Sequence, residues 1–269
     1  MSEMKLSVVL PLLVPTPFLR AMTEFAIRTL RLHADGLFEL IVTEADGDWF
    51  DPDASKMTVP ADPLLKIDKY LRFNPKIGAV RELNAGVDIA EGDLILSTGN
   101  DVFAPPHWDT ALRQVFAERP DAVLASLSAY EPGAIVGPQQ AIDMIVEGFY
   151  SPFMCFRRGW RFDEAFIKIY QDSDMVMRVY ESGGRAYRTC RAHVHHLLRM
   201  TTDHVDPEQH ARDLARDERL FYKRWGNSPL AMFGIIRAGF QQFGHEHEAR
   251  ISRIQLHYDP VQEEEGAVK

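Results

Sequence analysis

The chain has 269 residues, 46% of them hydrophobic, and carries a net charge of −9. This is an ordinary globular composition, and at this length one large domain with an appendage can bury a sizeable core. The acidic balance disfavours a broad electrostatic footprint for DNA or RNA, so we expect no tight nucleic-acid binding. No stretch approaches the roughly 18 apolar residues of a membrane span.

The cysteine content and the N-terminal pattern bear on the compartment. Two cysteines, Cys155 and Cys190, do not make a disulfide framework, and the apolar run at 6–13 lacks the basic leader and the cleavage site of a signal peptide. A reducing, cytoplasmic setting is therefore expected.

The first 130 residues alternate between strand and helix patterns. An apolar run at 6–10 predicts a buried strand that Pro11 ends, and apolar residues at helical spacing predict a helix over 18–34. A strand over 38–42 leads into an acidic turn beginning at Glu44, and residues 50–72 show no regular pattern. The next predicted elements are a helix over 80–91, a strand over 94–96, a helix over 107–119 and a strand over 122–127. This order favours parallel strands joined by right-handed crossovers.

The second half has a different character. Residues 131–150 are rich in Gly and Pro and then amphipathic, and the pattern next predicts a strand over 151–156, a turn over 160–164, a helix over 175–182 and a strand over 186–194. A helix is predicted from Asp206 through Trp225, followed by an apolar helical segment near 229–243 and an acidic tail expected to be disordered. We therefore expect an α/β fold with a mostly parallel central sheet flanked by helices over 1–205, and a C-terminal helical extension over 206–269.

One carboxylate stands just past a predicted central strand. Asp101 follows the strand at 94–96 after a run of small and polar residues, and Pro105 and Pro106 prevent the strand from simply continuing. Ligands of open α/β sheets bind at the carboxyl ends of the strands. Asp101 is therefore a candidate ligand-binding residue, although an isolated Asp can also cap a helix or close a turn.

Short motifs along the chain strengthen this interpretation. They are Leu6–Pro11, Glu39–Glu44, Asn74–Gly78 with Asn84-Ala85-Gly86, Ala90–Asp93, Gly99-Asn100-Asp101, Phe162-Asp163-Glu164, Asp172-Ser173-Asp174 with Arg178, Gly184, His196 and Lys223–Gly226. In this order they resemble the family 2 glycosyltransferases of the GT-A fold, over roughly residues 5–226. The resemblance implies a GT-A-like, Rossmann-like domain with a donor-binding half over about 1–105 and an acceptor half over 106–205. It also implies inverting transfer from a UDP-, GDP- or dTDP-linked sugar to a hydroxyl of a glycan or other acceptor, assisted by Mn²⁺ or Mg²⁺.

The resemblance assigns metal ligands. The triplet Gly99-Asn100-Asp101 corresponds to the family's Asp-x-Asp metal motif, and only its last residue keeps a carboxylate. Asp101 and His196 are the expected ligands, with His195 as the alternative to His196. A surface or core role for either histidine is the other interpretation. Mg²⁺ and Mn²⁺ prefer oxygen ligands and need only one or two carboxylates when a diphosphate and water supply the rest. As a zinc site the histidines at 193, 195 and 196 are poor, because paired cysteines and an HExxH spacing are absent.

The expected donor-binding residues are Pro11, Glu44, Asp46, Asn84, Gly99 and Asn100. Glu44 and Asp46 follow the second strand, where the family reads the base and ribose, and a carboxylate accepts well from ribose hydroxyls; a solvated acidic turn is the alternative. Asn84 and Gly86 interrupt a predicted helix, where Gly costs about 1 kcal/mol relative to Ala. The reason is either close approach of the backbone to the donor or tight packing of the helix on a strand.

The expected general base is Asp172, because the acceptor hydroxyl must lose a proton as it attacks the anomeric carbon. The family's acidic pair is usually Glu-Asp, and this chain has Gln171-Asp172. Alternatively, Asp172 caps a helix beginning near Ser173. Asp174 either caps that helix or pairs with Arg178 at i+4.

The resemblance places Trp160, Asp163 and Glu164 on the acceptor side. Trp160 is either a stacking platform for a sugar or a buried core residue, and the loop at 199–204 is expected to close over the donor.

Two other functions remain open. A nucleotidyltransferase also handles metal and diphosphate, but the segment after the first strand, Leu12–Pro15, has neither glycine nor positive charge. A non-catalytic nucleotide-sugar-binding module would explain the missing first Asp of the metal motif and the missing Glu of the acidic pair.

Overall fold

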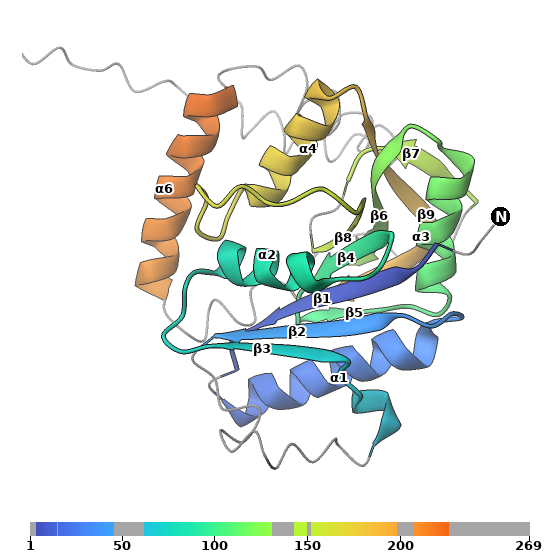
Figure 1. Cartoon of the computed structure of the whole chain (residues 1–269), viewed down its shortest axis with the longest axis horizontal. Helices are drawn as coiled ribbons and strands as arrows, with labels where there is room; N and C mark the ends of the chain where they lie inside the picture. Colours follow the sequence, from blue (N-terminus) through green and yellow to red (C-terminus); the bar gives the residue numbers. More distant parts are fainter. Residues whose placement is uncertain are drawn as a thin grey trace, which may run out of the picture.

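The structure is a computed structural model that describes residues 4–14, 16–45, 62–130, 143–149, 152–197 and 207–225. These residues form three layers, in which one sheet carries helices on both faces (Figure 1). The strand order is β3-β2-β1-β4-β8-β6-β9-β5, and β7 pairs with β9. The expected α/β architecture is confirmed.

The strands are β1 (Leu6–Leu12), β2 (Glu39–Ala45), β3 (Lys69–Phe73), β4 (Leu94–Thr98), β5 (Val102–Phe103), β6 (Ala122–Tyr130), β7 (Ile145–Glu147), β8 (Phe153–Arg157) and β9 (Arg185–His196). The helices are α1 (Pro17–His33), α2 (Ala79–Ile89), α3 (Trp108–Glu118), α4 (Gln171–Glu181) and α6 (Pro207–Trp225), with a 3₁₀ turn η2 (Pro63–Leu65).

Most strands run in one direction. Strand β1 is parallel to β2 and β4, β2 is parallel to β3, and β6 is parallel to β9. Strand β8 is antiparallel to both β4 and β6, so β6 and β9 share the direction of β1. Only β5, β7 and β8 are reversed. The carboxyl ends of β1, β2, β4, β6 and β9 therefore lie along one edge of the sheet, which we call the carboxyl edge.

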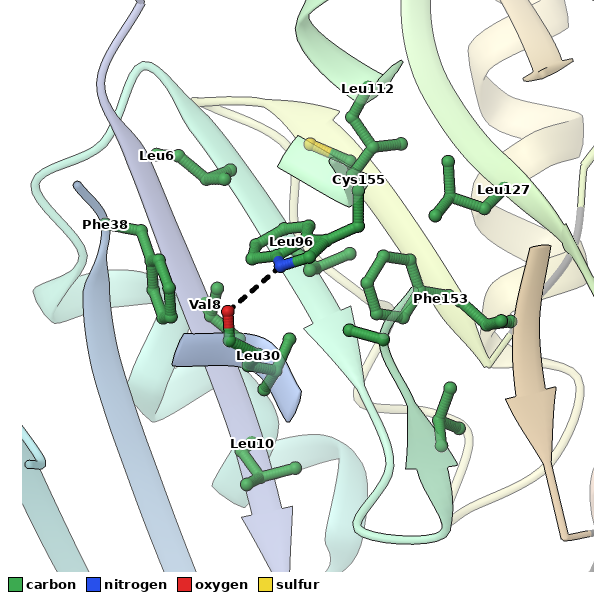
Figure 2. Close-up of a cluster of buried hydrophobic side chains, with 14 of the residues drawn as sticks. Leu6, Val8, Leu10, Leu30, Phe38, Leu96, Leu112, Leu127, Phe153 and Cys155 are labelled. Atoms are coloured by element: carbon green, nitrogen blue, oxygen red, sulfur yellow. Dashed lines mark hydrogen bonds between the residues drawn. The ribbon is translucent and has the colours of Figure 1, made fainter. Parts of the chain in front are cut away.

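The two faces of the sheet have separate cores. In β1, Val8 and Leu10 face the core under α1 and α3, whereas Val9 faces the core under α2, α4 and α6. Figure 2 shows part of the first core, where Leu6, Leu96 and Phe153 from three strands meet Leu30 of α1. Trp108 is fully buried there, and its Nε1 donates to the carbonyl of Leu30 at 3.0 Å. This alternation along the strand fixes the register, since a slip by one residue would exchange the two cores.

Two local predictions in the first half were wrong. Strand β1 continues through Pro11 to Leu12. Beyond Val9 it pairs only with β2, so the missing N–H of Pro11 costs at most one ladder bond. Within the stretch predicted as irregular, η2 and β3 form. Strand β3 lies at the edge of the sheet and all its residues are half-buried, so its charged side chains hid the strand pattern.

Gly86 allows α2 to pack closely against the sheet. A Cβ at this position would lie 2.5 Å from Cγ1 of Val9 and 3.0 Å from Cγ2 of Thr43. The tight helix–strand contact is therefore the explanation for this glycine, and the proposed approach of its backbone to the donor is not needed.

The remaining elements follow the prediction with shifted ends. Helix α4 begins at Gln171, earlier than expected, and Gly183 closes it with φ +84° as predicted. The helix predicted from Asp206 to Trp225 is α6. Asp46, the loop at 199–204, the segment near 229–243 and the acidic tail lie outside the described residues. Among the helices that the structure describes, none is long and apolar enough to cross a membrane.

Candidate functional site

The candidate site begins in a turn at the carboxyl edge. After β4 ends at Thr98, the amide of Val102 donates to the carbonyl of Gly99 at 3.4 Å. The chain then enters β5, which pairs with the end of β9, so that Val102 stands opposite His196. Oδ2 of Asp101 lies 3.7 Å from Nε2 of His196. The two residues expected to bind metal are thus brought together.

The backbone holds this pair in place. The amide of Leu197 donates to the carbonyl of Asp101 at 2.9 Å, directly after His196. The side chains of His196 and Asp101 are 11% and 14% exposed, so both stay within reach of a ligand while most of their surface is covered. His195, the alternative ligand, stands opposite Phe103 and is exposed.

Gly99 makes room for the carboxylate of Asp101. A Cβ at position 99 would lie 2.7 Å from Oδ1 of Asp101, closer than real Cβ contacts come. Any side chain here would push that carboxylate aside. Glycine at the first position of the triplet therefore follows from how Asp101 is seated.

Asn100 turns inward, away from the solvent. It is 5% exposed, and its Nδ2 donates to Oγ1 of Thr23 in α1 at 3.0 Å. Thr23 in turn donates to the carbonyl of Leu19 at 2.8 Å. Asn100 therefore anchors the turn over 99–101 to α1.

Glu44 is a buried strand residue, so the alternative of a solvated acidic turn at this residue is wrong. It lies in β2 with 0% exposure, and the phenol of Tyr70 in β3 donates to its Oε2. Burial and this hydrogen bond raise the pKa of Tyr70 above its ordinary value, so the phenol stays protonated and remains a donor. Pro11 of β1 pairs with Thr43 of β2, one position before Glu44. Pro11 therefore lies near Glu44 at the carboxyl edge.

Asn84 joins α2 to the segment after β8. It is 1% exposed, donates to the carbonyl of Phe162 at 2.9 Å and accepts from the amide of Phe162 at 3.0 Å. It also donates to Oε1 of Glu164 at 3.2 Å. Asn84 and Glu164 are thus brought together as a clamp between α2 and this segment.

Asp163 forms the turn and reaches α6. Its Oδ1 accepts from the amide of Ala165 at 2.8 Å, and its Oδ2 accepts from Nη1 of Arg224 at 2.6 Å. Burial would raise the pKa of Asp163, but the hydrogen bonds from Ala165 and Arg224 outweigh it and hold the pKa below its usual value. The carboxylate is therefore ionised at neutral pH.

Trp160 is half-buried against the core beneath α4. The guanidinium carbon of Arg178 lies 6.0 Å from its ring centroid, within cation–π range. Trp160 therefore packs partly on the core, as expected of a core residue, and stays partly exposed, as expected of a stacking platform for a sugar.

Asp172 lies in the first turn of α4. Strand β9 begins at the edge of the sheet opposite the carboxyl edge, and α4 ends shortly before it. The start of α4, with Asp172, therefore lies toward the carboxyl edge. Asp172 is not the N-cap, because that position is Tyr170 with φ 62°. Its Oδ1 accepts from the adjacent amide of Ser173 at 2.7 Å. The structure thus puts Asp172 at the same edge as Asp101, with its carboxylate stabilised by the helix dipole.

Asp174 is the hub of a network that the sequence showed only in part. It is 0% exposed and accepts from Nε of Arg178 at 2.8 Å, which confirms the expected i+4 pair. It also accepts from Arg224 at 2.7 Å and from Nε1 of Trp225 at 3.0 Å. The Arg-Trp motif of the C-terminal helix therefore binds a carboxylate of α4.

Asp217 was missed entirely at the sequence level. This α6 residue is 0% exposed and accepts from the backbone amides that precede Tyr170. An acidic residue in a helix rich in charged side chains gives no signal of burial, and only the packing of α6 reveals it.

Few side chains of the described residues are available to bind a metal ion at this site. No group of three or more His, Cys, Asp or Glu side chains that could hold a metal ion occurs in the described ranges. His193 is 6% exposed, and burial, aided by the charges of Arg188 and His195, lowers its pKa and favours the neutral form. One carboxylate and one imidazole, Asp101 and His196, still fit a Mn²⁺ or Mg²⁺ ion that takes its other ligands from a diphosphate and water.

Solved structures share this fold. A structure of S. aureus TarS 1–349 in complex with UDP matches at a TM-score of 0.55 and 14% identity, over 91% of this chain and 77% of that one. TarS 1–349 in complex with UDP-GlcNAc matches at 0.54 and 15%, over 84% and 74%. GalNAc-T7 with UDP, GalNAc and Mn²⁺ matches at 0.57 and 10%, over 74% of this chain and 45% of that one. No protein-family model and no curated protein matches the chain.

These likenesses define the class of fold. The chain has the GT-A-like fold of glycosyltransferase structures, which confirms the expectation from the sequence motifs. At 10–15% identity the likeness is one of fold.

Proposed function

We propose that the protein is an inverting, metal-assisted glycosyltransferase that moves a sugar from a nucleotide-sugar donor to a hydroxyl acceptor. The observation that carries this proposal is the pair of Asp101 and His196, 3.7 Å apart at the carboxyl edge. Ligands of open α/β sheets bind at this edge. The likeness to structures that hold UDP, UDP-GlcNAc or UDP with GalNAc and Mn²⁺ supports the same class of donor.

Asp101 and His196 would hold the divalent cation. When bound, such a cation stabilises the negative charge that develops on a leaving diphosphate. Gly99 keeps the Asp101 carboxylate free to face the ion, and Asn100 fixes the turn by its bond to Thr23. These contacts predict a metal affinity that depends on the diphosphate, because the part of the chain that the structure describes supplies two ligands here.

The donor's nucleoside belongs, in this proposal, near the ends of β1 and β2. Pro11 and Glu44 mark that place in the described structure, and Asp46 follows in sequence. The carboxylate of Glu44 is fully buried and accepts from Tyr70, so in this proposal it supports the nucleoside site from within the sheet. Asn84 acts indirectly, by holding α2 against the segment that carries Asp163 and Glu164.

Asp172 is the proposed general base. Its place in the first turn of α4 directs it toward the carboxyl edge, and it takes the proton of the acceptor hydroxyl as that oxygen attacks the anomeric carbon. Attack from the face opposite the leaving diphosphate inverts the anomeric configuration. Trp160, with its partly exposed ring, is the proposed platform for an acceptor sugar.

The proposal keeps the division predicted from sequence, with donor binding in about 1–105 and acceptor binding in 106–205. The reducing, cytoplasmic setting also stays part of it, in agreement with two free, buried cysteines.

A nucleotide screen tests the function. UDP, GDP and dTDP are compared by thermal shift with Mn²⁺ and with EDTA, and turnover is then measured as release of nucleotide from the matching sugar donors. We expect one nucleotide to stabilise the protein with Mn²⁺, by about 2.7 kcal/mol at 100 times its dissociation constant, and its sugar conjugate to turn over. Binding without turnover, even with a panel of hydroxyl acceptors, would instead identify a non-catalytic nucleotide-sugar-binding module.

A further inference from the structure

A buried carboxylate of α6 binds the segment that leads into α4. Oδ2 of Asp217 accepts from the amides of Ile167 at 3.0 Å, Lys168 at 2.9 Å and Ile169 at 3.0 Å, and its Oδ1 accepts from Ile167 at 3.1 Å. The Asp217 side chain is 0% exposed. Three consecutive N–H groups that converge on one anion form a nest, a backbone arrangement that binds negative charge.

A carboxylate suits this nest better than any neutral side chain. It offers only acceptors, and its second oxygen also accepts from Nη1 of Arg216 at 3.0 Å. An asparagine of the same shape would have to turn an NH₂ group toward one of these donors. The negative charge is therefore part of what holds the segment.

The bound segment is continuous with the proposed base. Ile169 is followed by Tyr170, the left-handed N-cap of α4, and then by the first turn with Asp172. The ring of Tyr170 stacks on Phe221 of α6 with centroids 5.2 Å apart and an interplanar angle of 27°. Phe221 lies one helical turn beyond Asp217, so both contacts come from one face of α6.

The other side of the segment is fixed by α2. The carbonyl of Ile167 accepts from the amide of Val80 at 3.3 Å. The carbonyl of Tyr170 accepts from the amide of Asp174 at 2.8 Å, which fixes the first turn of α4. Contacts on both sides of the segment thereby fix the backbone that carries Asp172.

We propose that Asp217 is a positioning residue, which fixes the segment 167–170 and thereby holds Asp172 in place to receive the acceptor's proton. This inference rests on the proposed function of Asp172. It gives the C-terminal helix a specific part in the reaction, even though Asp217 itself touches neither donor nor acceptor.

Hydrogen exchange on the wild-type chain tests the anchoring without any variant. The amides of Ile167, Lys168 and Ile169 should exchange as slowly as the hydrogen-bonded amides of α4 from Asp174 onward, because each donates to a buried carboxylate. Exchange at the rate of an open loop would overturn the anchoring whether or not the protein proves to be a transferase.

A double-mutant cycle tests the catalytic part. Asp217→Asn should lower kcat on the order of 10²-fold, the scale expected when a reacting group is misplaced by about 1 Å, and should leave the affinity for nucleotide and Mn²⁺ unchanged. In the Asp172→Asn background the same change should cost little more, because the group it positions is already lost. Glu218→Gln is the matched control, since the neighbouring side chain accepts from the Tyr170 hydroxyl at 3.3 Å and Gln still accepts there.

The outcomes separate the two ideas. A wild-type chain that transfers no sugar from any donor would refute the proposed function and leave the exchange result to decide the anchoring. An active wild type with near-normal Asp217→Asn turnover, or equal losses in both backgrounds, would refute the positioning role. If Asp217→Asn does not fold, Phe221→Leu, which shortens the stack on Tyr170, replaces it in the same cycle and must show the same loss of kcat without loss of nucleotide affinity.

Discussion

Asp101 and His196 come from distant parts of the sequence, yet Oδ2 of one lies 3.7 Å from Nε2 of the other. The short pairing of β5 with the end of β9 creates this contact. The first test is therefore whether nucleotide binding depends on a metal ion at this pair. A nucleoside diphosphate should stabilise the wild-type fold more with Mn²⁺ than with EDTA, and Asp101→Ala should abolish the difference, as measured by thermal shift.

The control for this experiment is Asp88→Asn. Asp88 is a half-exposed carboxylate of α2 that pairs with Arg161 at 3.0 Å, and such pairs contribute about 0–1 kcal/mol. It should leave the Mn²⁺-dependent shift intact. Equal shifts with Mn²⁺ and with EDTA in the wild type would refute the metal assignment.

Gly99→Ala should damage ligand binding more than folding. The added Cβ would sit 2.7 Å from Oδ1 of Asp101, and the carboxylate is the easier group to move. We expect the Mn²⁺-dependent nucleotide affinity to fall roughly tenfold or more, equivalent to about 1.4 kcal/mol, with an unfolding midpoint in urea near that of the wild type. Titration calorimetry with Mn²⁺ and nucleotide measures the affinity. An unchanged affinity would contradict the role of Gly99 in placing the Asp101 carboxylate.

Asp172→Asn separates proton transfer from donor binding. Asn keeps the shape of the side chain and can still accept from the amide of Ser173, so the helix start should be preserved. Transfer should fall on the order of 10²–10⁴-fold, the contribution of a general base, which is about 3–5 kcal/mol in the barrier. Affinity for nucleotide and Mn²⁺ should stay close to wild type. Near-normal turnover with a true acceptor would remove Asp172 from the mechanism.

The Asp174 network should dominate the docking of α6. Asp174→Ala should cost on the order of 3 kcal/mol in the free energy of unfolding, because it leaves Arg224 and Trp225 without their buried acceptor. Asp163→Asn is the control, since Asp163 also pairs with Arg224 but is about one-third exposed, and it should cost less than about 1 kcal/mol. Urea unfolding of both variants measures the difference. Equal costs would contradict the central role of Asp174.

Gly86→Ala tests the contact between α2 and the sheet. Alanine is the better helix former by about 1 kcal/mol, so the change would stabilise a helix with free space around it. The Cβ would instead lie 2.5 Å from Cγ1 of Val9, and overpacking of this kind costs about 1–3 kcal/mol. We expect net destabilisation in urea unfolding. A more stable variant would mean that α2 has room to move away from β1.

The alternation of strands and helices could be predicted from the sequence alone, because apolar residues recur at periods of two and 3.6 wherever an element covers a core. The position of Asp101 just past a strand could also be predicted, since small residues and two prolines follow that strand, and Asp172 precedes the apolar helical pattern of 175–182. Strand β3 escaped prediction for the opposite reason. It is an edge strand, half-buried throughout, and its charged residues carry no clear period.

Which of the expected site residues lie together could not be predicted from the sequence, because it depends on the tertiary fold. Asp101 meets His196 through a two-residue strand too short to leave a periodic signal, whereas Asn100 and Asn84 turn to partners inside the fold. Asp217 looked like any other charge in a polar helix until α6 packed against the segment before α4. Local pattern reports whether a residue lies in a helix, strand or turn. The partner of a buried carboxylate depends on contacts between segments remote in sequence, which form only when the layers of the fold close on one another.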